Sequence, residues 1–202
     1  MSVKIATVAT FENAADLVAR IWDDAGRPNL LRMEGFDGVG KSGLAKLVVK
    51  LIGAAHVEVD KFAFKAEVPG PYRDCLRRDD LDAEVGSALA MGGPTILDAV
   101  CLDEVVPSVR WGRGFAVYVK RLSFNNPTPI WHEGFHLEDK SELSSDEPHR
   151  GILLYHRNFK PHEHADLIIE LPDIGHTISN FAFDRTYCFD PAGADIITCR
   201  VA

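Results

Sequence analysis

Apolar residues recur along this chain with helical spacing in some segments and in short continuous runs in others. The segment 44–52 shows the first pattern, because its apolar residues follow the i, i+3, i+4, i+7, i+8 spacing of an amphipathic helix that Gly53 then ends. The same spacing predicts helices over 11–22, 81–89 and 148–159, and a short helical stripe over 102–109. The short apolar runs predict strands over 30–34, 56–60, 95–100, 115–119 and 165–171.

The order of these elements predicts the fold class. Strands that alternate with helices are joined by right-handed crossovers, which gives a mainly parallel sheet with helices on both faces. We therefore expect one α/β domain over 1–202 with a sheet of about five strands. Two segments interrupt the alternation: a long loop at 61–76, and a polar, proline-containing flap from about 122 to 150. The β-like runs at 181–189 and 195–201 are expected to extend one sheet edge in the antiparallel direction.

A glycine-rich segment with the pattern GxxxxGK[ST] lies between the first predicted strand and the helix at 44–52. Glycines permit a tight loop whose backbone N–H groups converge on phosphate oxygens, and the following helix points its positive N-terminal end at the same anion. In this pattern Lys41 neutralises the β- and γ-phosphates and the Ser42 hydroxyl binds magnesium. The residues expected to bind the nucleotide are Gly35, Phe36, Asp37, Gly38, Val39, Gly40, Lys41, Ser42 and Gly43.

The stretch 34–42, EGFDGVGKS, resembles the phosphate loop of P-loop nucleoside and nucleotide kinases, and the position of Asp37 resembles that in thymidylate kinases. No NKxD guanine motif is present, which disfavours a GTPase. From about 30 to 170 the chain is more similar to uridine-kinase-like small-molecule kinases. The matching segments are 57–62, 95–102, 155–157 and 160–169. This resemblance implies a three-layer α/β/α P-loop NTPase fold that uses ATP and Mg²⁺.

Two aspartates are candidates for the chemistry at the γ-phosphate. Asp60 and Asp98 each end, or nearly end, a predicted parallel strand, and ligands bind beyond the carboxyl ends of such strands. The resemblance implies that Asp60 is the base toward the acceptor hydroxyl and that Asp98, with Ser42, lies at the magnesium. The alternatives are a turn or cap aspartate for Asp60 and an internally paired aspartate for Asp98. Asp37 is expected either to bind the acceptor hydroxyl or only to shape the loop.

Cations that cover the phosphates are fewer than the family pattern implies. The family's arginine pairs after the fourth strand are absent, because Arg121 is followed by LSFNN. Arg150 and Arg157, seven residues apart on one helical face, are the candidates for stabilising charge in the transition state, with solvated surface arginines as the alternative. A third group near the long loop is expected either to hold an anionic acceptor or to lie on the surface. It consists of Arg73, Arg77 and Arg78.

Two histidine patterns are weaker candidates for metal sites. The HExxH pattern at 132–136 binds zinc only when both histidines project from one helix, and Pro127, Pro129 and Gly134 disfavour a helix there. His162 and His164 precede a predicted strand and are expected to form its polar start.

Composition sets the broad class of the protein. With 46% hydrophobic and 26% charged residues the chain has an ordinary globular mixture, and its net charge of −8 disfavours nucleic acid as a partner. The four cysteines form no CxxC pair, and no segment has the length or the apolar content of a membrane span. We expect a soluble cytoplasmic protein whose ligands are a nucleoside triphosphate and a small-molecule acceptor, with an undetermined oligomeric state.

Three functions are compatible with these features. The first is an ATP-dependent kinase that transfers the γ-phosphate to a hydroxyl of a small, nucleoside-like acceptor. The second is a nucleoside monophosphate kinase, which Asp37 and the arginines near the long loop would permit. The third is a nucleotide-binding protein or slow NTPase without transferase activity, which the small number of arginines in the flap favours.

Overall fold

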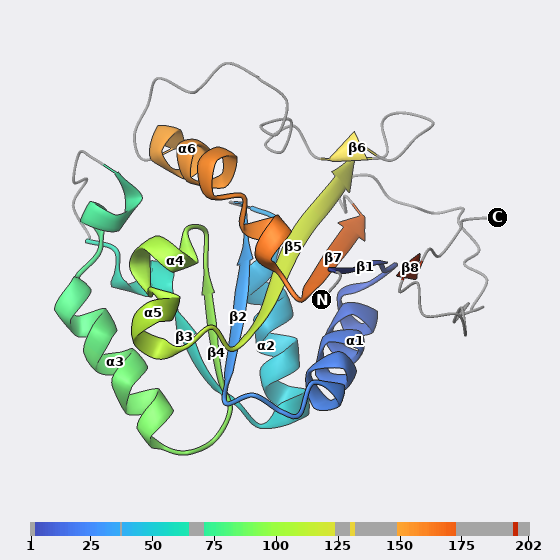
Figure 1. Cartoon of the computed structure of the whole chain (residues 1–202), viewed down its shortest axis with the longest axis horizontal. Helices are drawn as coiled ribbons and strands as arrows, with labels where there is room; N and C mark the ends of the chain where they lie inside the picture. Colours follow the sequence, from blue (N-terminus) through green and yellow to red (C-terminus); the bar gives the residue numbers. More distant parts are fainter. Residues whose placement is uncertain are drawn as a thin grey trace.

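A single sheet forms the centre of the computed structural model, which describes residues 3–36, 38–64, 71–123, 130–131, 149–172 and 196–197. Six of its strands are parallel to one another (Figure 1). In spatial order they are β3 (Ala55–Glu58), β4 (Thr95–Ala99), β2 (Leu30–Gly35), β5 (Phe115–Ser123), β7 (Leu167–Pro172) and β1 (Lys4–Thr7). The two-residue strand β6 (Ile130–Trp131) pairs with β5 in the antiparallel direction, and β8 (Ile196–Ile197) pairs with β1.

Helices cover both faces of this sheet, as Figure 1 shows. α1 (Phe11–Asp24) and α2 (Lys41–Ile52) pack on one face, where Leu31 and Met33 of β2 are fully buried with them. The opposite face carries α3 (Arg78–Ala90), α4 (Leu102–Val105), α5 (Ser108–Trp111) and α6 (His149–Phe159). The 3₁₀ helices are η1 (Val59–Phe62), η2 (Tyr72–Cys75) and η4 (Pro161–His164). The expected α/β architecture with a mainly parallel, doubly covered sheet is therefore confirmed.

Three expected elements differ from the structure. The sheet has more than about five strands, because residues 4–7 form a further parallel strand whose four residues give too short a pattern to recognise. The run at 195–201 contributes β8, which is parallel and not antiparallel: Ile196 lies opposite Ile5 in parallel register. The helical stripe at 102–109 is two helices, α4 and α5, separated at Val106 and Pro107, since proline has no N–H with which to continue α4.

Other expectations lie partly outside the described residues. Of the expected flap, residues 124–129 and 132–148 are not described. The β-like run at 181–189 and residues 65–70 of the long loop also lie outside the described residues. Where the long loop is described, it includes η2 and a bridge between Ala63 and Leu76. Among the described helices, none combines the length and the apolar character needed to cross a membrane.

Candidate functional site

The glycine-rich segment connects the end of β2 to the first residue of α2, in the central part of the sheet. Gly38 and Gly40 have φ angles of 73° and 97°, which are left-handed conformations that a side chain makes costly. A Cβ at Gly40 would also approach the Phe11 ring to 2.6 Å. Val39 is buried in the core and anchors the segment, while Asp37 lies outside the described residues. The glycines thus meet the backbone requirements of a tight loop before a helix.

Lys41 is the first residue of α2, and its side chain folds back over the glycine-rich segment. Its Nζ donates a hydrogen bond to the Phe36 carbonyl oxygen at 2.7 Å, and the residue is 5% exposed. This contact keeps the ammonium beside the loop and the helix N-terminus, where backbone N–H groups of the first turn have no partner within the helix. The Lys41 ammonium, the loop and the helix N-terminus together create a concentration of positive charge suited to an anion.

Ser42 and Asp98 join α2 to strand β4. Ser42 Oγ donates to Asp98 Oδ2 at 2.5 Å, and the other carboxylate oxygen, Oδ1, lies 2.6 Å from His56 Nε2 of β3. Asp98 is 2% exposed, so these two contacts compensate for the removal of its carboxylate from water. The internal pairing considered for Asp98 therefore exists, and it includes the serine predicted to bind magnesium. His56 was not recognised in the sequence, because nothing along the chain relates it to position 98.

The oxygen atoms of Ser42 and Asp98 match the preference of magnesium for hard ligands. Mg²⁺ bound with a nucleotide takes one or two protein ligands and fills its remaining positions with water and phosphate oxygens. A hydroxyl and a carboxylate oxygen 2.5 Å apart, beside the glycine-rich segment, satisfy that requirement. Among the described residues no group of three or more His, Cys, Asp or Glu side chains is arranged to hold a metal by itself. The pair therefore fits a metal that a phosphate helps to bind.

Asp60 lies in η1, directly after β3, so the strand expected over 56–60 ends two residues earlier, at Glu58. Its carboxylate is exposed and accepts a hydrogen bond from the buried Tyr72 hydroxyl of η2. Burial, followed by the negative charge of Asp60 and the hydrogen bond to it, raises the pKa of Tyr72. Asp60 therefore directly follows β3, the strand that pairs with the β4 strand of Asp98.

The arginines considered for covering the phosphates do not all lie near the glycine-rich segment. Arg150 and Arg157 are exposed on α6. Arg121, whose context in the sequence did not match the family pattern, donates from Nη1 to the Gly38 carbonyl oxygen at 3.3 Å. It reaches the glycine-rich segment because β5 continues to Ser123, four residues beyond the strand predicted at 115–119. Arg121 is therefore the arginine that the described residues place at the loop.

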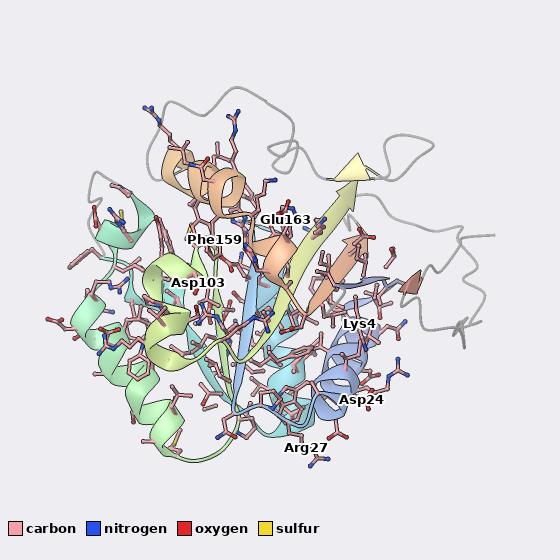
Figure 2. The ribbon with its side chains drawn as sticks, viewed as in Figure 1. Lys4, Asp24, Arg27, Asp103, Phe159 and Glu163 are labelled. Carbon is pink, nitrogen blue, oxygen red and sulfur yellow. The ribbon has the colours of Figure 1, made fainter. Side chains whose placement is uncertain are left out.

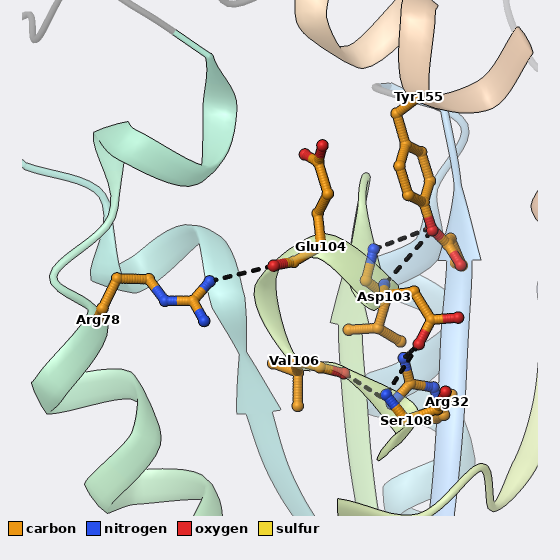
Figure 3. A network of polar contacts seen from close by, with 9 residues as sticks. Arg32, Arg78, Asp103, Glu104, Val106, Ser108 and Tyr155 are labelled. Carbon is orange, nitrogen blue, oxygen red and sulfur yellow. Dashed lines mark hydrogen bonds and ion pairs between the residues drawn. The ribbon is translucent and has the colours of Figure 1, made fainter. Parts of the chain in front are cut away.

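The arginines near the long loop make local contacts with neighbouring elements. Arg77 Nη1 pairs with Asp80 at 2.7 Å, and Arg78 Nη1 donates to the Glu104 carbonyl oxygen at 3.3 Å (Figure 3). Arg73 Nε lies 3.6 Å from Asp74 Oδ1. Arg73 and Arg77 are exposed, in line with the surface position considered for them, and Arg78 is half-buried beside α4.

Helix α6 contacts the glycine-rich segment through His156. Its Nδ1 lies 2.9 Å from the Tyr118 hydroxyl, and its ring centroid lies 5.6 Å from that of Phe36. Burial lowers the pKa of His156 to about 3, so the imidazole is neutral at physiological pH. No feature of the sequence distinguished this histidine from its neighbours, although it packs the helix that follows the predicted flap against the loop.

Of the two histidine patterns, the one at His162 and His164 lies among the described residues. His162 and His164 lie in η4, immediately before β7, in agreement with a polar start to that strand. The HExxH segment at 132–136 lies outside the described residues.

Comparison of the sequence with protein-family models finds no match, and comparison with curated proteins finds none either.

Proposed function

We propose that this protein is an ATP-dependent kinase that transfers the γ-phosphate to a hydroxyl of a small, nucleoside-like acceptor. The contact between Ser42 and Asp98 carries the proposal. It joins the first turn of the helix after a glycine-rich segment to the neighbouring parallel strand, where a nucleotide-bound magnesium would need both oxygens. The sequence pattern GxxxxGK[ST], with its positive-φ glycines, gives independent support.

In this proposal each group near the loop acts on the triphosphate. The backbone N–H groups of the loop and the α2 N-terminus bind the β- and γ-phosphates, and Lys41 neutralises their charge. Ser42 and Asp98 would hold Mg²⁺, which when bound neutralises charge on the phosphate oxygens. Arg121, held next to Gly38, is the cation in position to oppose charge on the γ-phosphate.

Asp60 would position and deprotonate the acceptor. The proton of the attacking hydroxyl passes to the Asp60 carboxylate, a bond forms between the acceptor oxygen and the γ-phosphorus, and the bond from that phosphorus to the β,γ-bridging oxygen breaks. The products are ADP and the phosphorylated acceptor. The hydrogen bond from the Tyr72 hydroxyl orients the Asp60 carboxylate for this step.

A scan of acceptors with ATP and Mg²⁺ tests the proposal. Nucleosides, nucleoside monophosphates and simple sugars are compared for formation of a phosphorylated product. The Asp60→Asn variant should lose at least about a hundredfold in kcat, since proton transfer by a positioned base contributes that much. Asp24→Asn, a change at an exposed aspartate at the end of α1, is the matched control and should transfer at the wild-type rate.

The outcomes separate the three functions. Transfer to nucleosides or sugars supports the proposal, and transfer only to monophosphates indicates a nucleoside monophosphate kinase. If ATP binds but no acceptor is phosphorylated, the protein binds or slowly hydrolyses the nucleotide; the exposed positions of Arg150 and Arg157 favour this outcome among the alternatives. Full transfer activity in Asp60→Asn would contradict the role given to Asp60.

A further inference from the structure

A cavity lies on the face of the sheet opposite α1 and α2, and Glu34, the residue before Gly35, is part of its lining. Its volume is about 270 Å³, and residues of β2, α4, β5 and η4 contribute to its lining. Figure 2 labels Asp103 and Phe159, which both line it, on α4 and at the end of α6. Its size is below that of a site for a drug-sized ligand, so it suits a molecule of one ring.

Two ionisable side chains of the central strand face this cavity. Arg32 and Glu34 alternate along β2 with the core residues Leu31 and Met33, so both point to the α4 side of the sheet. Burying a charged group at such a position costs free energy unless the group has a partner. Ionisable groups with perturbed pKa values are concentrated at functional sites. Burial raises the pKa of Glu34 to about 7.

The contacts of Arg32 and Glu34 leave capacity for a ligand. Arg32 donates from Nη1 to the Val106 carbonyl and from Nη2 to Asp103 Oδ1, both at 2.9 Å, whereas a guanidinium has five N–H donors (Figure 3). The Glu34 carboxylate accepts a bond from the Leu102 amide at 2.8 Å and another from the Tyr155 hydroxyl, and an ionised carboxylate can accept about four. The two residues are two positions apart on the same face of β2, so a hydrogen-bond donor and an acceptor lie side by side in the lining.

Aromatic rings form another part of the lining. Phe159 is 38% exposed; its ring stacks on Tyr155 with centroids 5.1 Å apart, and it lies 5.4 Å from the His164 ring. Phe159, His164 and Tyr118 all line the cavity. Flat aromatic rings beside the hydrogen-bonding groups of Arg32 and Glu34 favour a flat ligand over a compact ion such as phosphate or a zwitterionic amino acid.

We propose that this cavity binds a small planar heterocycle with an N–H donor beside a carbonyl acceptor, the pattern of an aminopyrimidine base. The donor bonds to the Glu34 carboxylate, the carbonyl accepts from Arg32, and the ring packs against Phe159. The cavity adjoins the glycine-rich segment through Glu34, but its lining contains none of the residues proposed to bind phosphate, magnesium or the acceptor, so it does not depend on the kinase proposal.

Titration with cytosine, monitored by calorimetry and by the amide resonances of labelled protein, tests this site. Wild-type protein should bind cytosine saturably, with resonance changes in β2, α4 and η4. Phe159→Ala and Glu34→Gln should each weaken binding by about tenfold, because each removes one of the ligand's main contacts. Met91→Ala, a change at a 70% exposed side chain at the end of α3, is the control and should bind like wild type.

Two further variants distinguish binding at this cavity from binding at the proposed kinase site. Lys41→Ala and Asp60→Asn should retain cytosine binding even where they abolish ATP binding or transfer. The proposal is wrong if cytosine does not bind at tens of millimolar, or if Phe159→Ala binds it as tightly as wild type. Saturable binding of inorganic phosphate or glycine in preference to cytosine would also overturn it. Phe159 is partly exposed, so its variant remains informative if Glu34→Gln does not fold.

Discussion

Ser42 Oγ donates to Asp98 Oδ2 over 2.5 Å, so the helix after the glycine-rich segment is joined directly to strand β4. The two residues are 56 positions apart, and parallel pairing of β2 with β4 brings them together. The same carboxylate also contacts His56 of β3. One buried group therefore links α2, β3 and β4 at the point where the proposed magnesium would lie.

The first prediction concerns the Ser42 hydroxyl. Ser42→Ala should weaken ATP binding by about tenfold in the presence of Mg²⁺, because one of the proposed metal ligands is lost. In the presence of EDTA the variant and the wild type should bind ATP with similar affinity. Equilibrium titration with a fluorescent ATP analogue measures both conditions. Ser87→Ala, a change at an exposed serine of α3, is the control; an equal loss with and without metal would argue against a metal ligand at Ser42.

The second prediction concerns the partner of Asp98 on β3. His56→Phe should lower the free energy of unfolding by about 1–3 kcal/mol, since one oxygen of a buried carboxylate loses its hydrogen-bond partner. His56→Gln keeps an N–H donor and should recover part of that loss. Urea unfolding monitored by circular dichroism gives the comparison. Equal stability of wild type and His56→Phe would mean that the contact contributes little.

The third prediction concerns the phenol that holds Asp60. Tyr72→Phe removes the hydroxyl that donates to the Asp60 carboxylate but leaves the proposed base in place. We expect kcat to fall severalfold, much less than in Asp60→Asn, because orientation is impaired while proton transfer remains possible. Steady-state kinetics with the best acceptor from the scan measures both variants. If Tyr72→Phe were as inactive as Asp60→Asn, the tyrosine itself would need a chemical role.

The fourth prediction is a pH dependence caused by His156. Its pKa in the folded protein, about 3, lies below the value of about 6.5 expected for an unfolded chain. The stability that this neutral imidazole contributes is therefore complete above the unfolded pKa and is lost as the pH falls from there toward 3. Between about pH 7.5 and about pH 5.5, wild type should lose about 1.4 kcal/mol more than His156→Phe, which does not titrate at this position.

Urea unfolding of both proteins at the two pH values checks this difference. The other titratable groups are common to both proteins, so the double difference isolates His156. The same pH dependence in wild type and variant would show that the imidazole is not kept neutral in the folded protein.

The sequence predicted the larger elements and the residues of the loop because these depend on local patterns. The helix from Lys41 to Ile52 has an apolar stripe, and the spacing of Gly35, Gly40 and Lys41 is contained in eight residues. The strand at 4–7 was missed because four residues give too little periodicity, and its stability depends on pairing with β7. The direction of β8 also depends on tertiary pairing, which no local pattern contains.

Long-range contacts explain what was missed in the candidate site. The position of Arg121 at the loop depends on how far β5 extends, which was underestimated by four residues. His56, His156 and Glu34 acquire their surroundings from elements 38 to 68 residues away. Side-chain type alone does not distinguish them from ordinary residues of a strand or helix.

The affinity of ATP for the Lys41→Ala variant tests the central proposal most directly. Lys41 contributes the cation at the proposed phosphate site, so its loss should weaken binding of ATP with Mg²⁺ by about tenfold to a hundredfold, the effect of removing a hydrogen bond to a charged group. Lys50→Ala, a change at an exposed lysine in the last turn of the same helix, is the matched control and should bind like wild type. ATP binding that is equal in wild type, Lys41→Ala and Lys50→Ala, or that is absent in wild type, would contradict the proposal.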